Sequence, residues 1–308
     1  MTNLIKRILR NLPGVHALDR YLCYRYTGQF DPELYPRGHY YSPLPDLTEV
    51  QSRATVLFQQ DFDTALSIDL RPNAQRSLLA ELSRYYEDFD WPQRPAPEYR
   101  FHLNQRYFCH ADAIILYSML RHLRPKHIIE VGSGFSSALM LDTDERHLGN
   151  SVRFTFVEPF PERVKSILRS KDRAYCQLVQ DKVQNVPISI FQELEANDIL
   201  FVDSSHVSKI GSDVNMLLFN VLPTINVGVV IHFHDILWPF EYPKQWILDG
   251  RAWNEAYLVR AFLQYNHHFE ILLFNSFVAY AFRQFIEEGM PMFMRNSGGS
   301  LWIRKISQ

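Results

Sequence analysis

The chain has 308 residues, of which 46% are hydrophobic and 21% are charged, with a formal net charge of −2. This composition is typical of a globular protein of one or two domains, and it excludes a globally basic surface for nucleic acid. No apolar run approaches the roughly 20 residues of a transmembrane helix, so we expect no transmembrane segment. Cys23, Cys109 and Cys176 form no Cys-x-x-Cys pair. This argues against a disulfide framework and favours the cytoplasm.

The first hundred residues lack the alternation of strands and helices that follows them. The basic, amphipathic stretch 4–10 predicts a helix packed on its own domain or on a partner, with a membrane-surface contact as the alternative. Residues 38–46 are typical of an ordered loop, and residues 74–87 have the apolar spacing of a helix. We therefore predict an N-terminal extension or cap over residues 1–104, followed by a second domain over residues 105–308.

From about residue 108 the pattern becomes regular and predicts an α/β fold. A helix is expected over 111–123. Strands are expected near 127–131, 152–157, 176–179, 199–203, 228–233, 269–274 and 300–304. Alternation of strands and helices indicates a doubly wound, mostly parallel sheet. Because no clear crossover helix separates the last two strands, we expect them to form an antiparallel edge.

The most informative stretch is IIEVGSGFSS at residues 128–137, where an apolar strand ends in an acid, Gly-x-Gly and small hydroxyl residues. Gly132 permits a sharp strand-to-helix turn, and Gly134 lets a ligand approach the backbone. An acid, Glu130, two residues before the first glycine favours a positively charged or hydroxyl-rich ligand over a pyrophosphate. That preference favours S-adenosylmethionine over NAD. A plain strand–helix turn is the alternative that this motif leaves open.

Glu158 ends the second predicted strand, one strand–helix unit downstream of the glycine turn. An acid at this place can hydrogen-bond a ribose diol, as in NAD sites, so it supports a nucleoside ligand without choosing between the two. Ser137 stands where the NAD fingerprint has its third glycine. This counts against NAD.

Two clusters of acids and histidines stand at the ends of the fourth and fifth predicted strands, as DSSH at 203–206 and HFHD at 232–235. The carboxyl ends of parallel strands share one rim, so we expect both clusters beside the glycine turn. A histidine there could take a proton from a substrate hydroxyl. The clusters could instead bind a metal, with carboxylates alone favouring Mg²⁺ or Ca²⁺ and added imidazoles favouring Mn, Fe or Zn. In the third interpretation, the histidines only hydrogen-bond loop carbonyls.

An aromatic segment bounded by prolines, residues 236–243, follows the second cluster, and Trp246 and Trp253 come after it. This segment suits a substrate wall or lid, and equally a hydrophobic plug that packs under the N-terminal segment. Asp213 lies just before an expected helix, and we predict that it caps that helix.

These motifs, in this order, resemble the class I S-adenosylmethionine-dependent methyltransferases, in particular a bacterial branch with Asp-x-x-His after the fourth strand and His-Asp after the fifth. The resemblance covers roughly residues 105–308 and implies a Rossmann-like, seven-stranded sheet with one antiparallel strand. It implies a cofactor site in which Glu158 holds the ribose. The full predicted cofactor set is Glu130, Gly132, Ser133, Gly134, Glu158, Asp181 and Asp203.

Catechol-type methyltransferases of the same superfamily hold a divalent cation with acids after strands four and five, where Asp203 and Asp235 stand. Ile236 replaces the Asn that follows the second acid in those enzymes. The predicted metal ligands are Asp203, His206, His234 and Asp235, with Mg, Mn, Fe or Zn as candidate ions. The predicted catalytic residues are His206, His234 and Asp203.

The sequence thus predicts an S-adenosylmethionine-dependent methyltransferase that acts on a hydroxyl of a small, sugar-like or natural-product-like molecule. We expect no nucleic-acid partner, and a homo-oligomer is left open. The alternatives are a metal-dependent hydrolase or oxygenase on the same fold and a non-catalytic nucleotide-binding module. A dehydrogenase that uses NAD is a weaker alternative.

Overall fold

The computed structural model describes residues 35, 37–58, 67–108 and 110–308. Contacts divide the chain into two compact units, Met1–Leu57 and Phe58–Gln308. The amphipathic stretch at 4–10 lies outside the described residues, as do Cys23 and Cys109. Within the described part of the chain, no helix is long and apolar enough to cross a membrane.

The described part of the first unit begins with the predicted loop. The Gly38 amide donates a hydrogen bond to the Leu44 carbonyl oxygen at 3.0 Å, which closes the loop. Helix α3 (Leu47–Ser52) then begins at Asp46, whose carboxylate accepts a hydrogen bond from the Thr48 amide at 2.7 Å. Helix α4 (Ala54–Leu57) follows directly.

Seven strands of the described chain form one sheet in the order β3-β2-β1-β4-β5-β7-β6. They are β1 (His127–Val131), β2 (Arg153–Val157), β3 (Cys176–Val179), β4 (Ile199–Val202), β5 (Val230–Phe233), β6 (Phe269–Phe274) and β7 (Leu301–Lys305). Strands β1 to β5 pair in parallel, and β7 runs antiparallel to both β5 and β6. The predicted mostly parallel, doubly wound sheet with an antiparallel edge is confirmed.

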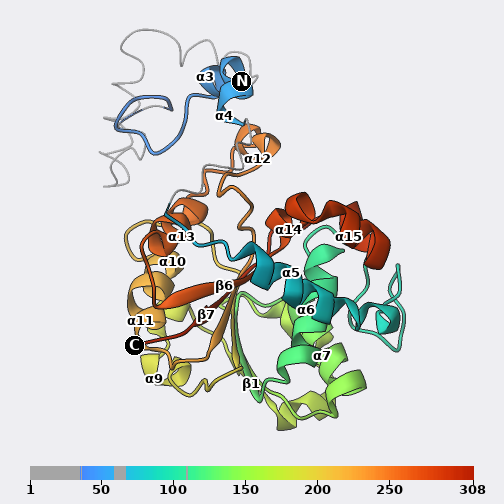
Figure 1. The fold of residues 1–308 in the computed structure, drawn as a ribbon. Helices are drawn as coiled ribbons and strands as arrows, with labels where there is room; N and C mark the ends of the chain where they lie inside the picture. Colours follow the sequence, from blue (N-terminus) through green and yellow to red (C-terminus); the bar gives the residue numbers. More distant parts are fainter. Residues whose placement is uncertain (1–34, 36, 59–66, 109) are drawn as a thin grey trace, which may run out of the picture. The chain divides into compact units, whose positions relative to one another are not determined.

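Helices cover both faces of the sheet, with α6 and α7 on one side and α10 and α11 on the other (Figure 1). The α-helices of the second unit are α5 (Pro72–Ser83), α6 (Ala111–Leu123), α7 (Phe135–Thr143), α8 (Glu162–Ile167), α9 (Ile188–Phe191), α10 (Asp213–Met216), α11 (Leu222–Thr224), α12 (Lys244–Leu248), α13 (Glu255–Leu263), α14 (Asn275–Ala281) and α15 (Arg283–Gly289). Shorter 3₁₀ or π turns lie at η1 (Tyr86–Asp88), η2 (Asp144–Leu148), η3 (Ser170–Ala174), η4 (Val183–Asn185), η5 (Leu217–Val221) and η6 (Pro291–Arg295).

The central strands are buried on both faces. Every residue of β1, β4 and β5 is buried, as expected for parallel strands between two helical layers. Strand β3, at one edge of the sheet, is only partly buried.

Part of the predicted N-terminal extension packs on this sheet. Helix α5 lies against β6, where the Gln75 side chain accepts a hydrogen bond from the Phe274 amide at 2.8 Å. Arg71 forms an ion pair with Glu270 of β6 at 2.6 Å. These contacts belong to the unit that begins at Phe58.

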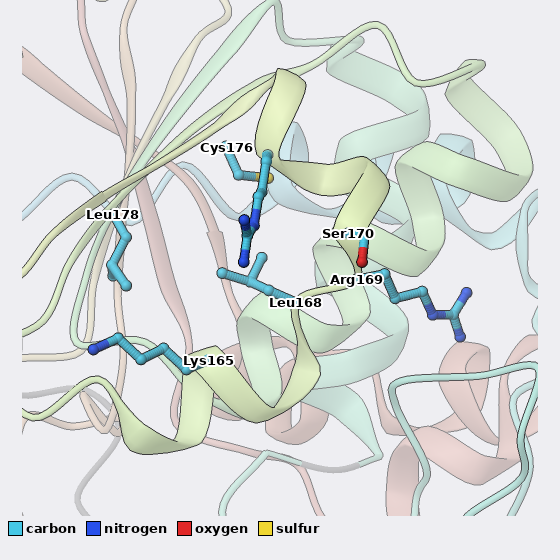
Figure 2. Close-up of a pocket in the computed structure, with 7 residues that line it drawn as sticks. Lys165, Leu168, Arg169, Ser170, Cys176 and Leu178 are labelled. Carbon is cyan, nitrogen blue, oxygen red and sulfur yellow. The ribbon is translucent and has the colours of Figure 1, made fainter.

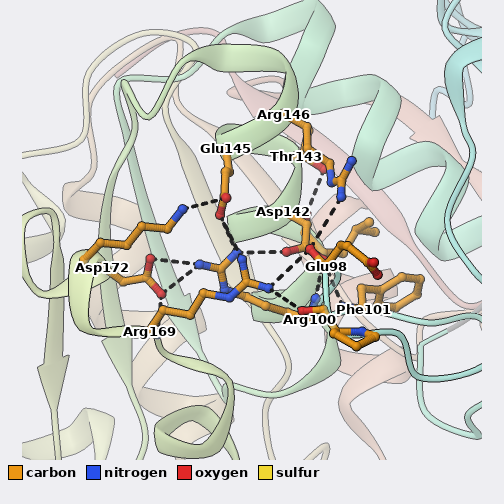
Figure 3. A network of polar contacts seen from close by, with 12 residues as sticks. Glu98, Arg100, Phe101, Asp142, Thr143, Glu145, Arg146, Arg169 and Asp172 are labelled. Carbon is orange, nitrogen blue, oxygen red and sulfur yellow. Dashed lines mark hydrogen bonds and ion pairs between the residues drawn. The ribbon is translucent and has the colours of Figure 1, made fainter.

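A buried ion network anchors the segment before α6 (Figure 3). The guanidinium of Arg100, whose side chain is 2% exposed, contacts Asp142 at 2.9 Å, Glu145 at 2.8 Å and Asp172 at 2.9 Å. Asp142 also accepts the amides of Arg100 and Phe101 at 2.7 and 3.0 Å. One side chain therefore ties residues 100–101 to α7, η2 and η3.

Arg100→Leu should lower the free energy of unfolding by about 3–5 kcal/mol, because it leaves buried carboxylates without their cation. Urea titration monitored by circular dichroism measures the change. The control is Arg94→Leu at an exposed arginine of the same segment. Equal, small effects of the two substitutions would contradict a stabilising role for the network.

Candidate functional site

The carboxyl ends of β1, β4 and β5 bring the predicted site residues onto one rim. The parallel hydrogen bonding continues past the strands: the Asp203 amide donates to Val131 at 2.8 Å, and the His234 amide donates to Val202 at 2.8 Å. The residues that follow each strand therefore lie side by side.

Gly132 is fixed by its surroundings. Its φ is +84°, and a Cβ at this position would lie 2.0 Å from the Asp203 carbonyl oxygen. Any side chain would have to displace the end of β4. Gly134 differs, because its φ of −172° is extended and a Cβ there would meet Arg163 Cδ at 3.4 Å, an ordinary contact. Its predicted role in ligand approach stays a prediction.

A cleft of about 610 Å³ lies along this rim, within the size range of small-molecule sites. Its lining includes Gly132 after β1, residues 157–160 at and after the end of β2, residues 182–184 after β3 and residues 203–205 after β4. Of the predicted cofactor residues, Gly132, Glu158 and Asp203 thus share one cleft.

Glu158 is held in place by backbone donors. Its two carboxylate oxygens accept the amides of Ser133 at 3.1 Å and Phe160 at 2.8 Å. The carboxylate is therefore oriented at the end of β2, where it lines the cleft.

The Glu130 side chain is fully buried and lies under the turn. Its carboxyl group accepts hydrogen bonds from Ser136, at 2.5 Å, and from Ser137. Ser137 in turn accepts the Gly134 amide at 2.9 Å. Burial raises the pKa of Glu130 to about 8, despite the two hydroxyl donors. Glu130 therefore supports the turn from below.

Asp181 is exposed, and its carboxylate accepts the Lys182 amide and the Asn185 side-chain amide, both at 2.7 Å. Its neighbours at 182–184 line the cleft. The predicted cofactor contact of Asp181 stays a prediction.

The His206 ring is the centre of the acid–histidine cluster. Its Nδ1 lies 2.9 Å from Glu255 Oε2, and its Nε2 lies 3.4 Å from Asp203 Oδ1 and 3.7 Å from Asp235 Oδ2. Burial alone would lower the pKa of His206, but Asp203 and Glu255 raise it to about 10. The ring is therefore an imidazolium at neutral pH.

Two buried acids complete the cluster, and neither was among the predicted site residues. Glu255, 1% exposed at the start of α13, also accepts the Ser204 hydroxyl at 2.8 Å. Asp112 of α6 accepts the Ser300 hydroxyl at 2.6 Å and the Gly299 amide at 3.1 Å. Both come from helices distant in sequence, so no local motif marked them.

His234 is turned away from the cleft. Its Nε2 lies 3.3 Å from the Tyr107 carbonyl oxygen, and its ring packs against Phe108 at 5.3 Å. Burial would lower the pKa of His234, but Asp235, Asp203 and Asp112 raise it. The side chain is only 6% exposed.

The predicted helix cap at Asp213 is wrong by one residue. Ser212 caps α10 by accepting the Asn215 amide at 3.2 Å. The Asp213 carboxylate instead accepts the Ser205 amide and hydroxyl at 2.7 and 2.6 Å. It thus fixes the loop that follows Asp203.

The aromatic segment divides into two parts. Trp238 and Phe240 are buried and pack against Phe274 of β6. Further along, the Trp253 ring lies 4.3 Å from the His206 ring, and Arg251 stacks on Trp253 at 4.8 Å. The first part is core, and the second covers the acid–histidine cluster.

The four predicted metal ligands lie together, but their geometry does not fit a metal ion. Among the described residues, no group of three or more His, Cys, Asp or Glu side chains could hold one. The Nε2 of His206 lies between Asp203 and Asp235, where a cation shared by those acids would have to sit.

Residues 129–236 match the model of a family described as a methyltransferase domain. An uncharacterized protein of Archaeoglobus fulgidus is 31% identical over 172 residues, which are 54% of this chain and 76% of that protein. The chain belongs to one family with this archaeal protein, and its residues 129–236 are similar to a methyltransferase domain. The matched stretch runs from within β1 to just past β5, and it includes Gly132, Glu158, Asp203 and Asp235.

Two solved structures are similar at low identity. The methyltransferase PaMTH1 of Podospora anserina, bound to SAH, is 14% identical, with 86% of this chain and 99% of that chain covered and a TM-score of 0.40. The O-methyltransferase TomG of Streptomyces achromogenes, in complex with SAM, is 10% identical, with 84% and 96% covered and a TM-score of 0.39. The family membership stated above rests on the archaeal relative.

Glu130→Gln should change how stability depends on pH. Because the folded-state pKa of Glu130, about 8, is above its ordinary value of 4.5, the folded state holds a proton that the unfolded chain releases. Wild-type stability therefore falls as pH rises from about 5 to 9. The free energy of unfolding of the variant, relative to that of the wild type, should therefore rise by on the order of 3 kcal/mol from pH 5 to pH 9. Urea titrations at pH 5, 7 and 9 measure this, with exposed Glu195→Gln as the control. A pH-independent difference would contradict the raised pKa.

Proposed function

We propose that this protein is an S-adenosylmethionine-dependent methyltransferase that methylates a hydroxyl group of a small molecule. The observation that carries the proposal is the cleft of the methyltransferase domain, where Gly132, Glu158 and Asp203 meet. The resemblance assigns each of these three positions to the cofactor site.

The cleft fits this cofactor chemically. The fixed Glu158 carboxylate can accept hydrogen bonds from a ribose diol. Partial burial would raise the pKa of Asp203, but His234 and His206 lower it below its usual value, so Asp203 stays ionised. A carboxylate on the cleft wall favours a cationic sulfonium. When bound, S-adenosylmethionine supplies a methyl group on a good leaving group, so the protein needs mainly to align the acceptor.

Of the three predicted catalytic residues, we propose that Asp203 contacts the acceptor. Its side chain is 38% exposed and lines the cleft, whereas the His206 and His234 side chains are each 6% exposed. Asp203 would accept a hydrogen bond from the acceptor hydroxyl and take its proton as the new carbon–oxygen bond forms. His206, with carboxylates at both ring nitrogens, orients Asp203 and is a poor proton acceptor.

Direct titration tests the cofactor. Calorimetry should show micromolar binding of S-adenosylmethionine and S-adenosylhomocysteine and no binding of NAD. Glu158→Gln should weaken binding about tenfold, because it removes a charged acceptor for the ribose. Glu162→Gln, at an exposed glutamate on α8 outside the cleft, is the matched control. Folded protein that binds neither S-adenosyl compound would overturn the proposal.

Activity assays test the base and the metal. Once an acceptor is found, Asp203→Asn should lower kcat by about 10²-fold or more, through loss of the proton acceptor. Asp90→Asn, at an exposed aspartate outside the cleft, should leave kcat unchanged. EDTA should not change the wild-type rate. A rate that EDTA abolishes and Mg²⁺ restores would show that the acids rearrange around a metal.

A further inference from the structure

A second cavity, of about 450 Å³, lies between helix α8 and edge strand β3 (Figure 2). Its lining comes from α8, the turn that follows it, η3 and β3. The lining residues are Lys165, Leu168, Arg169, Ser170, Arg173, Cys176 and Leu178. Among the described residues, it shares no lining residue with the cleft that holds Gly132 and Asp203.

The charge of this cavity is positive. Its ionisable lining residues are three cations, Lys165, Arg169 and Arg173, and one thiol; in the described chain no carboxylate lines it. The nearby Asp172 side chain is fully buried and contacts Arg100 at 2.9 Å, so it faces away from the cavity.

The three cations differ in how far their charge is compensated. Lys165 donates to Gln180, a neutral group, at 2.9 Å. Arg169 contacts Glu145 at 3.4 Å, but Arg100 and Lys171 bind the same carboxylate more closely, at 2.8 and 2.6 Å. Within the described residues, the exposed Arg173 side chain forms no hydrogen bond or ion pair. Positive charge is thus left uncompensated at the edge of this second cavity.

The rest of the lining is apolar. Leu168 and Leu178 are partly buried and pack against the core. Burial raises the pKa of the Cys176 thiol to about 12, so the thiol stays neutral and acts as apolar lining. Figure 2 shows Lys165 and Arg169 on opposite sides of Leu168.

We propose that this cavity binds a small organic phosphate, with its apolar body against Leu168 and Leu178 and its phosphate at Arg173 and Lys165. An arginine fork can bind phosphate with two parallel hydrogen bonds, and a lysine adds a point charge. The volume lies in the range of small-molecule sites. This site is separate from the proposed methyl-transfer cleft, so it stands whether or not that function does.

Calorimetric titration of the full chain with phenyl phosphate tests the proposal. Phenyl phosphate should bind at least about tenfold more tightly than inorganic phosphate or phenol, because it uses both the charged and the apolar parts of the cavity. Arg173→Gln should weaken binding about tenfold. Because the Arg173 side chain has no partner within the described residues, this variant should keep the wild-type thermal midpoint.

Two control variants test whether phenyl phosphate binds in this cavity rather than elsewhere on the protein. Arg94→Gln removes the same charge at an exposed arginine that does not line the cavity, and it should leave binding unchanged. Lys182→Gln removes a charge from the other cleft and should also leave it unchanged. No binding of phenyl phosphate, or binding that Lys182→Gln weakens and Arg173→Gln does not, would overturn the proposal.

Discussion

The close approach of Gly132 to the Asp203 carbonyl is the constraint on which the rim depends. A Cβ at position 132 would lie 2.0 Å from that oxygen, so the end of β1 and the end of β4 can meet only over a glycine. The same turn carries the Ser133 amide that orients Glu158. The cleft thus depends on the lack of a side chain at Gly132. The turn that this glycine permits also presents the Ser133 amide that holds the Glu158 carboxylate on the cleft wall.

The acid–histidine cluster extends this constraint to two further elements, α13 and the end of β5. His206, which follows β4, contacts Glu255 of α13 on one side and Asp203 and Asp235 on the other. A cation between carboxylates offsets their mutual repulsion and lets them lie close together. Here the chain itself supplies that cation. The acids that line or border the cleft are therefore held in position by a buried side chain, which itself has little access to a ligand.

The sequence predicted the strands and the site residues that directly follow them, but it did not predict the site residues that tertiary packing brings to the rim. The apolar runs located β1, β3 and β6 at the bounds that the structure shows, because buried strands leave a strong local signal. Gly132 and Glu158 were found for the same reason, since each directly follows a strand. Glu255 and Asp112 were missed because helices far along the chain bring them to the rim. The Asp213 cap failed because an adjacent serine competed for the same role.

The Arg100 network connects the core to the second cavity through charge. Arg100 draws Asp172 fully into the interior and shares Glu145 with Lys171 and Arg169. Asp172 is thereby engaged in the interior, and Glu145 is shared among Arg100, Arg169 and Lys171, so neither carboxylate pairs with Arg173. A buried guanidinium needs several acids to offset its desolvation. Because Arg100 contacts Asp172 and Glu145, these acids do not compensate the positive charge of Arg173. The unpaired charge at Arg173 is in this sense a consequence of how the core is stabilised.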